Sequence, residues 1–145
     1  MDLRRVSLIL KLLSLGLPPD DYVVAGSGPL LAHGLRDEIG DLDLVARGAA
    51  WKAVSTMAVP VAAPSGHGRM VVLADGQIEV FDRWLPGTGD PGRLIESAER
   101  VQGIPFCPLR EVLGWKERSD RPKDRADVEL IKDYLSRADT SSRDA

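Results

Sequence analysis

The sequence predicts a small α/β domain, in which helices flank a small mixed β-sheet. One apolar run with β-branched residues stops at Gly26-Ser27-Gly28 before a helical segment. A two-residue Asp75-Gly76 connection joins two β-rich runs, which is a strong hairpin signal. With 145 residues the chain fits one domain, which we expect over residues 1–138, followed by a flexible polar tail at 139–145.

The first half of the chain alternates helices with strands. Leu8, Leu12 and Leu15 recur at helical spacing, which indicates an amphipathic first helix that ends at Gly16. Further on, Ser27 is a good N-cap for the helix after the first strand. The expected elements are a helix at Leu3–Leu15, a strand at Tyr22–Ala25, a helix at Pro29–His33, a strand at Leu42–Ala46 and a helix at Ala49–Met57.

The second half begins with the hairpin and ends in helices. The hairpin strands are expected at Met70–Ala74 and Gln77–Phe81. Pro86–Gly92 reads as a loop because it is rich in glycine and proline, and Ser97–Cys107 fits a helix end and a short edge strand. Two helices are expected after these segments, at Leu109–Lys116 and Lys123–Arg137.

Composition excludes several classes of protein. The net charge is −3 and the pI is near 5.4, so the overall charge does not indicate a nucleic-acid-binding protein. A local basic patch that binds RNA or DNA is still compatible with this charge. The single Cys107 excludes an intramolecular disulfide and a cysteine-rich zinc site. No apolar run reaches the roughly 20 residues that cross a bilayer, and Lys11 interrupts the one segment that resembles a signal sequence. A cytoplasmic protein without a membrane partner is therefore expected.

Two closely spaced carboxylates are the main candidates for chemistry. Asp41 and Asp43 lie two residues apart in a predicted strand, so both point to one face, and they repel each other unless a cation lies between them. Mg²⁺ removes that cost and commonly binds one or two carboxylates together with substrate phosphates. Glu79 is a third candidate and is favoured over Asp82; three such ligands hold two ions about 3.5–4 Å apart. The alternatives are a polar strand start for the pair and an ordinary solvent-facing side chain for Glu79.

The Gly-Ser turn and a later basic segment are candidates for binding phosphate. Gly26-Ser27 precedes a helix, where free backbone N–H groups attract anions, although simple capping is the more frequent role of such a turn. Lys116, Arg121 and Lys123 are available to neutralise a nucleoside triphosphate. Alternatively, this segment is a solvated helical turn whose Asp124 and neighbouring acids compensate the helix dipole.

These segments together resemble the nucleotidyltransferase superfamily of DNA polymerase beta, in particular the minimal nucleotidyltransferases and the AbiEii-type toxins. The likeness extends from about Tyr22 to Leu135. That family has a Gly-Gly/Ser turn, a helix, a strand with Asp-x-Asp and a later acid, and AbiEii-type proteins add a lysine, an arginine and an Asp-x-x-Asp. The matching segments are Gly26-Ser27, Asp41-Leu42-Asp43, Ile78-Glu79-Val80-Phe81, Lys116, Arg121 and Asp124-Arg125-Ala126-Asp127.

The resemblance implies an Mg²⁺-dependent enzyme that transfers NMP from an NTP to a hydroxyl acceptor on RNA or tRNA, a protein or a small molecule. Asp41, Asp43 and Glu79 would bind the metals, Lys116 would contact the NTP phosphates, and Asp124 would assist catalysis or position that lysine. A toxin of this type has a cognate antitoxin as partner. The rival is a non-catalytic member of the same fold that binds nucleotides or proteins, including an antitoxin.

Overall fold

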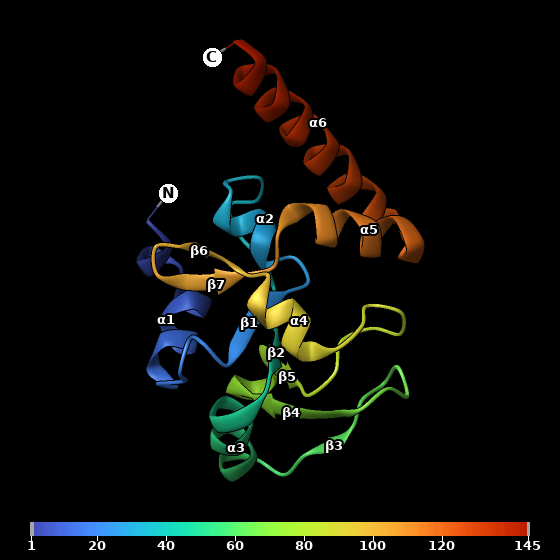
Figure 1. Cartoon of the computed structure of the whole chain (residues 1–145). Helices are drawn as coiled ribbons and strands as arrows, with labels where there is room; N and C mark the ends of the chain where they lie inside the picture. Colours follow the sequence, from blue (N-terminus) through green and yellow to red (C-terminus); the bar gives the residue numbers. More distant parts are fainter. Residues whose placement is uncertain (1, 145) are drawn as a thin grey trace.

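A seven-stranded mixed β-sheet with helices on both faces forms the molecule (Figure 1). This computed structural model describes the backbone of residues 2–144 and side chains through residue 138. The predicted α/β class with a mixed sheet is confirmed. None of the helices in that range is long and apolar enough to cross a membrane.

The sheet has the strand order β3-β4-β5-β2-β1-β7-β6. β1 pairs antiparallel with β2, and β2 pairs parallel with β5, so the two strands expected to carry carboxylates are neighbours. β7 lies parallel to β1 on its other side, and the remaining pairs are antiparallel. The strands are β1 (Tyr22–Ala25), β2 (Leu42–Ala46), β3 (Val61–Ala62), β4 (Arg69–Leu73), β5 (Ile78–Phe81), β6 (Glu99–Val101) and β7 (Ile104–Phe106).

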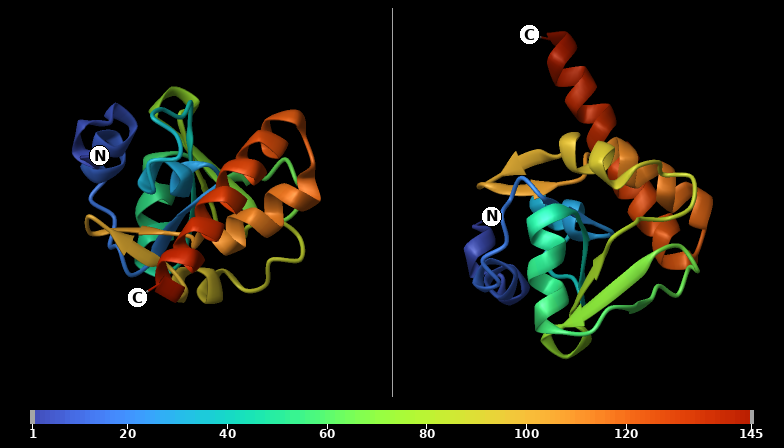
Figure 2. Two further views of the ribbon diagram at one scale, coloured as in Figure 1. Left: turned by 90° about the horizontal axis from the view of Figure 1, so that it is seen from above. Right: turned by 60° about the horizontal axis from the view of Figure 1, so that its bottom comes forward.

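Each face of the sheet has its own hydrophobic core. Side chains of α1 (Ser7–Ser14) and α3 (Gly48–Met57) pack on one face with Leu42, Leu44 and other sheet residues. Side chains of α4 (Pro91–Glu96), α5 (Leu109–Ser119) and α6 (Pro122–Asp144) cover the other face with Val45 and its neighbours. Figure 2 shows this layering. Asp43 alternates with Leu42 and Leu44, so it lies on the face of the second core.

The N-terminal helix is interrupted, contrary to the continuous helix predicted. A 3-10 turn, η1 (Leu3–Arg5), precedes α1, and Val6 between them has extended backbone angles. Asp2 accepts a hydrogen bond from the backbone N–H of Arg4, which favours a separate turn. Leu8 and Leu12 are buried as the helical spacing predicted.

Two of the hairpins show why turn geometry is difficult to predict. The predicted β4–β5 hairpin is present, but its connection is a 3-10 turn, η2 (Ala74–Gly76), in which Ala74 and Asp75 have positive φ angles. The segment predicted as a helix end and an edge strand is instead the β6–β7 hairpin. Gln102 and Gly103 form its turn with φ angles of 52° and 81°, which glycine adopts readily.

Several element boundaries near the second core differ from the prediction. Pro91 and Gly92 were assigned to a loop but begin α4, because the Asp90 carboxylate caps this helix by accepting from the Gly92 N–H at 2.8 Å. α6 continues to Asp144 rather than stopping at Arg137. The flexibility expected of 139–145 stays a prediction, since the side chains of this segment and all of residue 145 lie outside the described part.

Candidate functional site

The sheet brings the three predicted carboxylates to one place. Asp43 lies on β2 directly opposite Glu79 on the parallel neighbour β5, and Asp41 immediately precedes β2. Side chains two residues apart share a face, so Asp41 and Asp43 lie on the same side of the sheet as Glu79. Asp82, the alternative third ligand, instead accepts a hydrogen bond from the backbone N–H of Arg69 at 2.7 Å.

The turn after β1 lies directly against this carboxylate group. Gly26 has a φ of +59°, and a Cβ atom there would lie 2.5 Å from Oδ2 of Asp43. At Gly28, a Cβ would lie 2.3 Å from Cγ1 of Val24 on β1. Only glycine therefore allows the turn and α2 (Gly28–Ala32) to pack this closely on the strands. The Gly-Ser turn predicted to bind phosphate lies beside the carboxylates predicted to bind metal.

Ser27 does not act as the predicted N-cap. Its backbone is helical, and its side chain makes no capping hydrogen bond. Its Oγ instead accepts a hydrogen bond from Nζ of Lys116 on α5, at 3.2 Å. Ser27 thus links the turn to the basic segment. The two residues are 89 positions apart, so no local sequence pattern could predict this contact.

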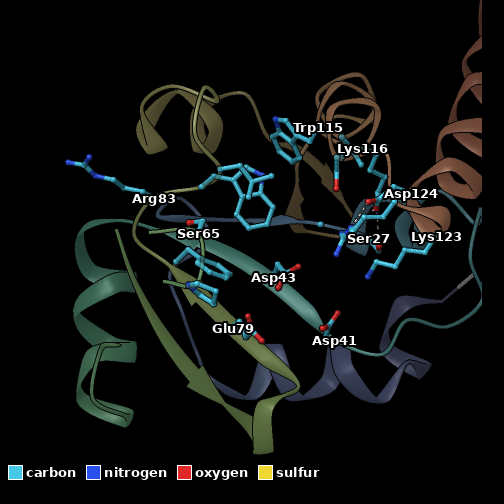
Figure 3. Close-up of a pocket in the computed structure, with 18 residues that line it drawn as sticks. Ser27, Asp41, Asp43, Ser65, Glu79, Arg83, Trp115, Lys116, Lys123 and Asp124 are labelled. Carbon is cyan, nitrogen blue, oxygen red and sulfur yellow. Dashed lines mark hydrogen bonds and ion pairs between the residues drawn. The ribbon is translucent and has the colours of Figure 1, made fainter. Parts of the chain in front are cut away.

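One pocket of about 330 Å³ contains every predicted site residue (Figure 3). Asp43, Asp41 and Glu79 lie along its floor, Ser27 and Lys123 lie to one side, and Ser65 and Arg83 lie to the other. The residues that line it are Gly26, Ser27, Asp41, Asp43, Pro64, Ser65, Glu79, Phe81, Arg83, Trp84, Leu85, Val112, Trp115, Lys116, Ser119, Arg121, Lys123 and Asp124.

The carboxylates interact electrostatically. Burial, with repulsion from Asp41 and Glu79, raises the pKa of Asp43 to about 7, against the attraction of Lys123 and Lys116. Burial and the charge of Asp41 also raise the pKa of Glu79. A site that disfavours its own negative charge gains free energy when a cation binds. The oxygen-only donors suit a hard cation such as Mg²⁺.

The three carboxylates do not lie close enough together to coordinate one metal ion as they stand. Among the described side chains, no group of three or more His, Cys, Asp or Glu residues is close enough together to hold an ion as it stands. Asp41 is exposed and so has space to turn toward Asp43. By their chemistry and by their shared face of the sheet, the residues fit a divalent cation.

The side of the pocket opposite the three carboxylates holds the cations Lys116, Arg121 and Lys123, and its buried residues are Lys116 and Asp124. Their side chains are 9% and 1% exposed, and Nζ lies 3.5 Å from Oδ1 of Asp124. Nε of Arg121 donates to Oδ2 of Asp124 at 2.7 Å. Burial alone would raise the pKa of Asp124, but hydrogen bonds from Arg121 and Ser119 and the charges of Lys116 and Arg121 lower it to about 2. Asp124 is thus ionised at neutral pH and orients two cations.

The sequence did not identify the aromatic side of the pocket. The rings of Phe81 and Trp84 meet edge to face with centroids 5.4 Å apart, and Trp84 meets Trp115 in the same way at 5.5 Å. Nε1 of Trp84 is buried without a hydrogen-bond partner among the described residues. Phe81 was recognisable in principle, because alternation along β5 places it on the face of Glu79. Trp84 follows the strand, and no periodicity indicates its direction.

Comparison of the chain with protein-family models, with curated proteins and with solved structures gives no match. No family assignment follows from these comparisons.

Proposed function

We propose that this protein is an Mg²⁺-dependent nucleotidyltransferase with a DNA polymerase beta-like fold. It would transfer NMP from an NTP to a hydroxyl acceptor on RNA or tRNA, a protein or a small molecule. The observation that carries the proposal is the shared pocket, where Asp41, Asp43 and Glu79 face a side that presents Lys116 and Lys123. Carboxylates that hold metal ions, beside lysines that neutralise phosphate charge, are the groups that transfer of a phosphorus group requires.

The order of elements supports the proposal independently of charge. Gly26-Ser27 follows the first strand and leads into a short helix. The antiparallel neighbour β2 carries Asp43, with Asp41 just before it, and the next strand presents Glu79 in register with Asp43. This order is the one expected from the resemblance in the sequence.

The side chains divide the work of the reaction. Asp41, Asp43 and Glu79 would hold Mg²⁺, which supplies positive charge to the phosphates and aligns the reacting oxygens when bound. Lys116 and Lys123 bind the β- and γ-phosphates as the negative charge of the leaving pyrophosphate develops. α2 has only five residues, so its dipole adds little and the side chains do most of this work.

The covalent step is an in-line displacement at the α-phosphorus. The acceptor oxygen forms a bond to this phosphorus, the bond to the bridging oxygen of pyrophosphate breaks, and a carboxylate of the pocket takes the proton of the acceptor hydroxyl. Asp124 is not the base, since its pKa of about 2 makes it a poor proton acceptor.

The test is label transfer from each α-labelled NTP with Mg²⁺, offering total RNA and the protein itself as acceptors. We expect transfer by the wild type and none by Asp41→Ala. Asp37→Ala is the matched control, because Asp37 is an exposed acid in the same loop and does not line the pocket. Mg²⁺-independent NTP binding without transfer would contradict the proposal and favour the non-catalytic binding module.

The resemblance also suggests a toxin with a cognate antitoxin, and this role is part of the proposal. Expression of the wild type would then arrest growth, whereas Asp41→Ala would not. Normal growth under expression of an active enzyme would contradict the toxin role without affecting the proposed chemistry.

A further inference from the structure

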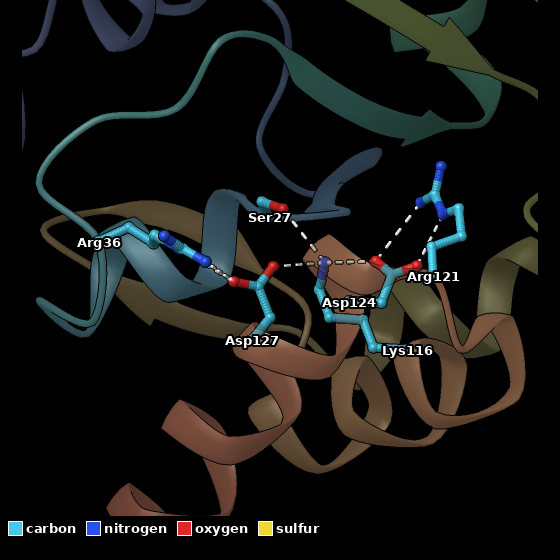
Figure 4. A network of polar contacts seen from close by, with 6 residues as sticks. All are labelled: Ser27, Arg36, Lys116, Arg121, Asp124 and Asp127. Carbon is cyan, nitrogen blue, oxygen red and sulfur yellow. Dashed lines mark hydrogen bonds and ion pairs between the residues drawn. The ribbon is translucent and has the colours of Figure 1, made fainter.

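The position of Lys116 is determined by three acceptors (Figure 4). Its Nζ lies 3.2 Å from Oγ of Ser27, 2.9 Å from Oδ2 of Asp127 and 3.5 Å from Oδ1 of Asp124. A lysine ammonium has three N–H donors, so a phosphate oxygen that binds Nζ would take the place of one of these acceptors. The shortest contact is the one to Asp127, on the second turn of α6, which does not line the pocket.

Asp127 is in turn held by Arg36. The side chain of Asp127 is 5% exposed, and Nε of Arg36 donates to its Oδ1 at 2.9 Å, with a second contact from the same guanidinium. One oxygen of Asp127 therefore faces Arg36 and the other faces Lys116. Arg36 comes from the loop between α2 and β2, the same loop that leads to Asp41.

The charges show what Arg36 contributes. Without it, Lys116 and Arg121 face two buried carboxylates, and Oδ1 of Asp127 is a buried acceptor without its cationic partner. Such an oxygen is costly to leave unpaired, so Asp127 would turn or draw the ammonium to itself. With Arg36 present, three cations face two carboxylates, so the network beside the pocket keeps a net positive charge.

We propose that Arg36 is a positioning residue, which acts through Asp127 to hold the Lys116 ammonium beside Ser27 at the phosphate end of the pocket. Arg36 itself does not line the pocket. This inference rests on the proposed function for its consequence, because a correctly placed Lys116 serves phosphate binding. The placement of Lys116 does not depend on which acceptor is used.

The first test measures the affinity of the full chain for inorganic triphosphate with Mg²⁺, by calorimetry, so that no choice of base is needed. We expect Arg36→Met to weaken triphosphate binding about tenfold, and Arg36→Lys to retain part of the wild-type affinity. In an Asp127→Asn background, adding Arg36→Met should not lower the affinity further. Arg125→Met is the matched control, because Arg125 also pairs with an aspartate, Asp120, but at the exposed surface. An equal loss in both backgrounds would overturn the inference.

The second test does not depend on the proposed function. Amine acetylation at Lys116, followed by mass spectrometry, reports directly how well its ammonium is held. We expect the rate in Arg36→Met to differ from the rates in the wild type and in Arg125→Met, at a temperature at which all three proteins are folded. An unchanged rate would overturn the inference. A changed rate in a protein that binds no triphosphate and transfers no label would refute the proposed function and leave the placement of Lys116 standing.

Discussion

Replacing Asp43 with asparagine provides a detailed test of the carboxylate site. The substitution keeps the shape of the side chain and removes its charge. In the wild type, burial and the neighbouring charges of Asp41 and Glu79 oppose ionisation of Asp43 and raise its pKa to about 7. Folding without a cation is therefore penalised at any pH where Asp43 is ionised.

The direction and size of the effect follow from linkage. Because the pKa of folded Asp43 lies above the ordinary carboxyl value of 3.8, its stabilisation is full below pH 4 and is lost as the pH rises through about 7. At about 1.4 kcal/mol for each pKa unit, the loss approaches about 4 kcal/mol. Asp43→Asn lacks this loss, so its unfolding free energy should exceed that of the wild type most at pH 8.

The assay is urea unfolding of both proteins in EDTA, from pH 4.5 to 8.5, with a repeat in Mg²⁺. We expect the difference between the two proteins to grow with pH in EDTA, and Mg²⁺ to stabilise the wild type at pH 8 much more than Asp43→Asn. A difference that does not change with pH, or equal stabilisation of both proteins by Mg²⁺, would refute the electrostatic account of this site.

Three further predictions concern other parts of the pocket. Gly26→Ala should abolish activity and lower the unfolding free energy by about 2 kcal/mol in urea melts, because the new Cβ would meet the carboxylate of Asp43 at 2.5 Å in a backbone with positive φ; a wild-type activity would contradict this packing. NTP binding should quench the fluorescence of Trp84 and Trp115, which line the pocket, and Trp115→Phe should reduce this quenching. Undiminished quenching in Trp115→Phe would show that the fluorescence change does not come from Trp115. Asp124→Asn should cost about 3 kcal/mol at pH 7, because it leaves two cations without a buried carboxylate. In the wild type this contribution is complete above pH 4 and lost as the pH falls through about 2, so acid unfolding of the variant should lack that step.

The strands that build the site could be predicted because their signals are local. Tyr22–Ala25 and Leu42–Ala46 occur in the structure with the predicted bounds, since buried apolar runs ended by glycine or polar residues have few other interpretations. The β6–β7 hairpin was missed because its strands have only three residues each and include Pro105. Such strands are stabilised by their partners rather than by their own composition.

The residues of the candidate site could be predicted from the sequence, but the side-chain contacts between them could not. Alternation in β2 and β5 placed Asp43 and Glu79 on consistent faces, and parallel pairing made them neighbours. The contact of Lys116 with Ser27 spans 89 positions of the chain, so only the packing of α5 determines it. Arg36 showed no pattern at all, because a lone arginine in a loop acquires its role only when α6 packs nearby.

The most direct test of the central claim compares α-labelled with γ-labelled NTP in the same reaction. The wild type with Mg²⁺ should transfer the α-label to an acceptor and release the γ-label in pyrophosphate, and Asp43→Asn should do neither. Transfer of the γ-label, or transfer of the α-label that persists in Asp43→Asn, would contradict the assignment of this pocket to nucleotidyl transfer.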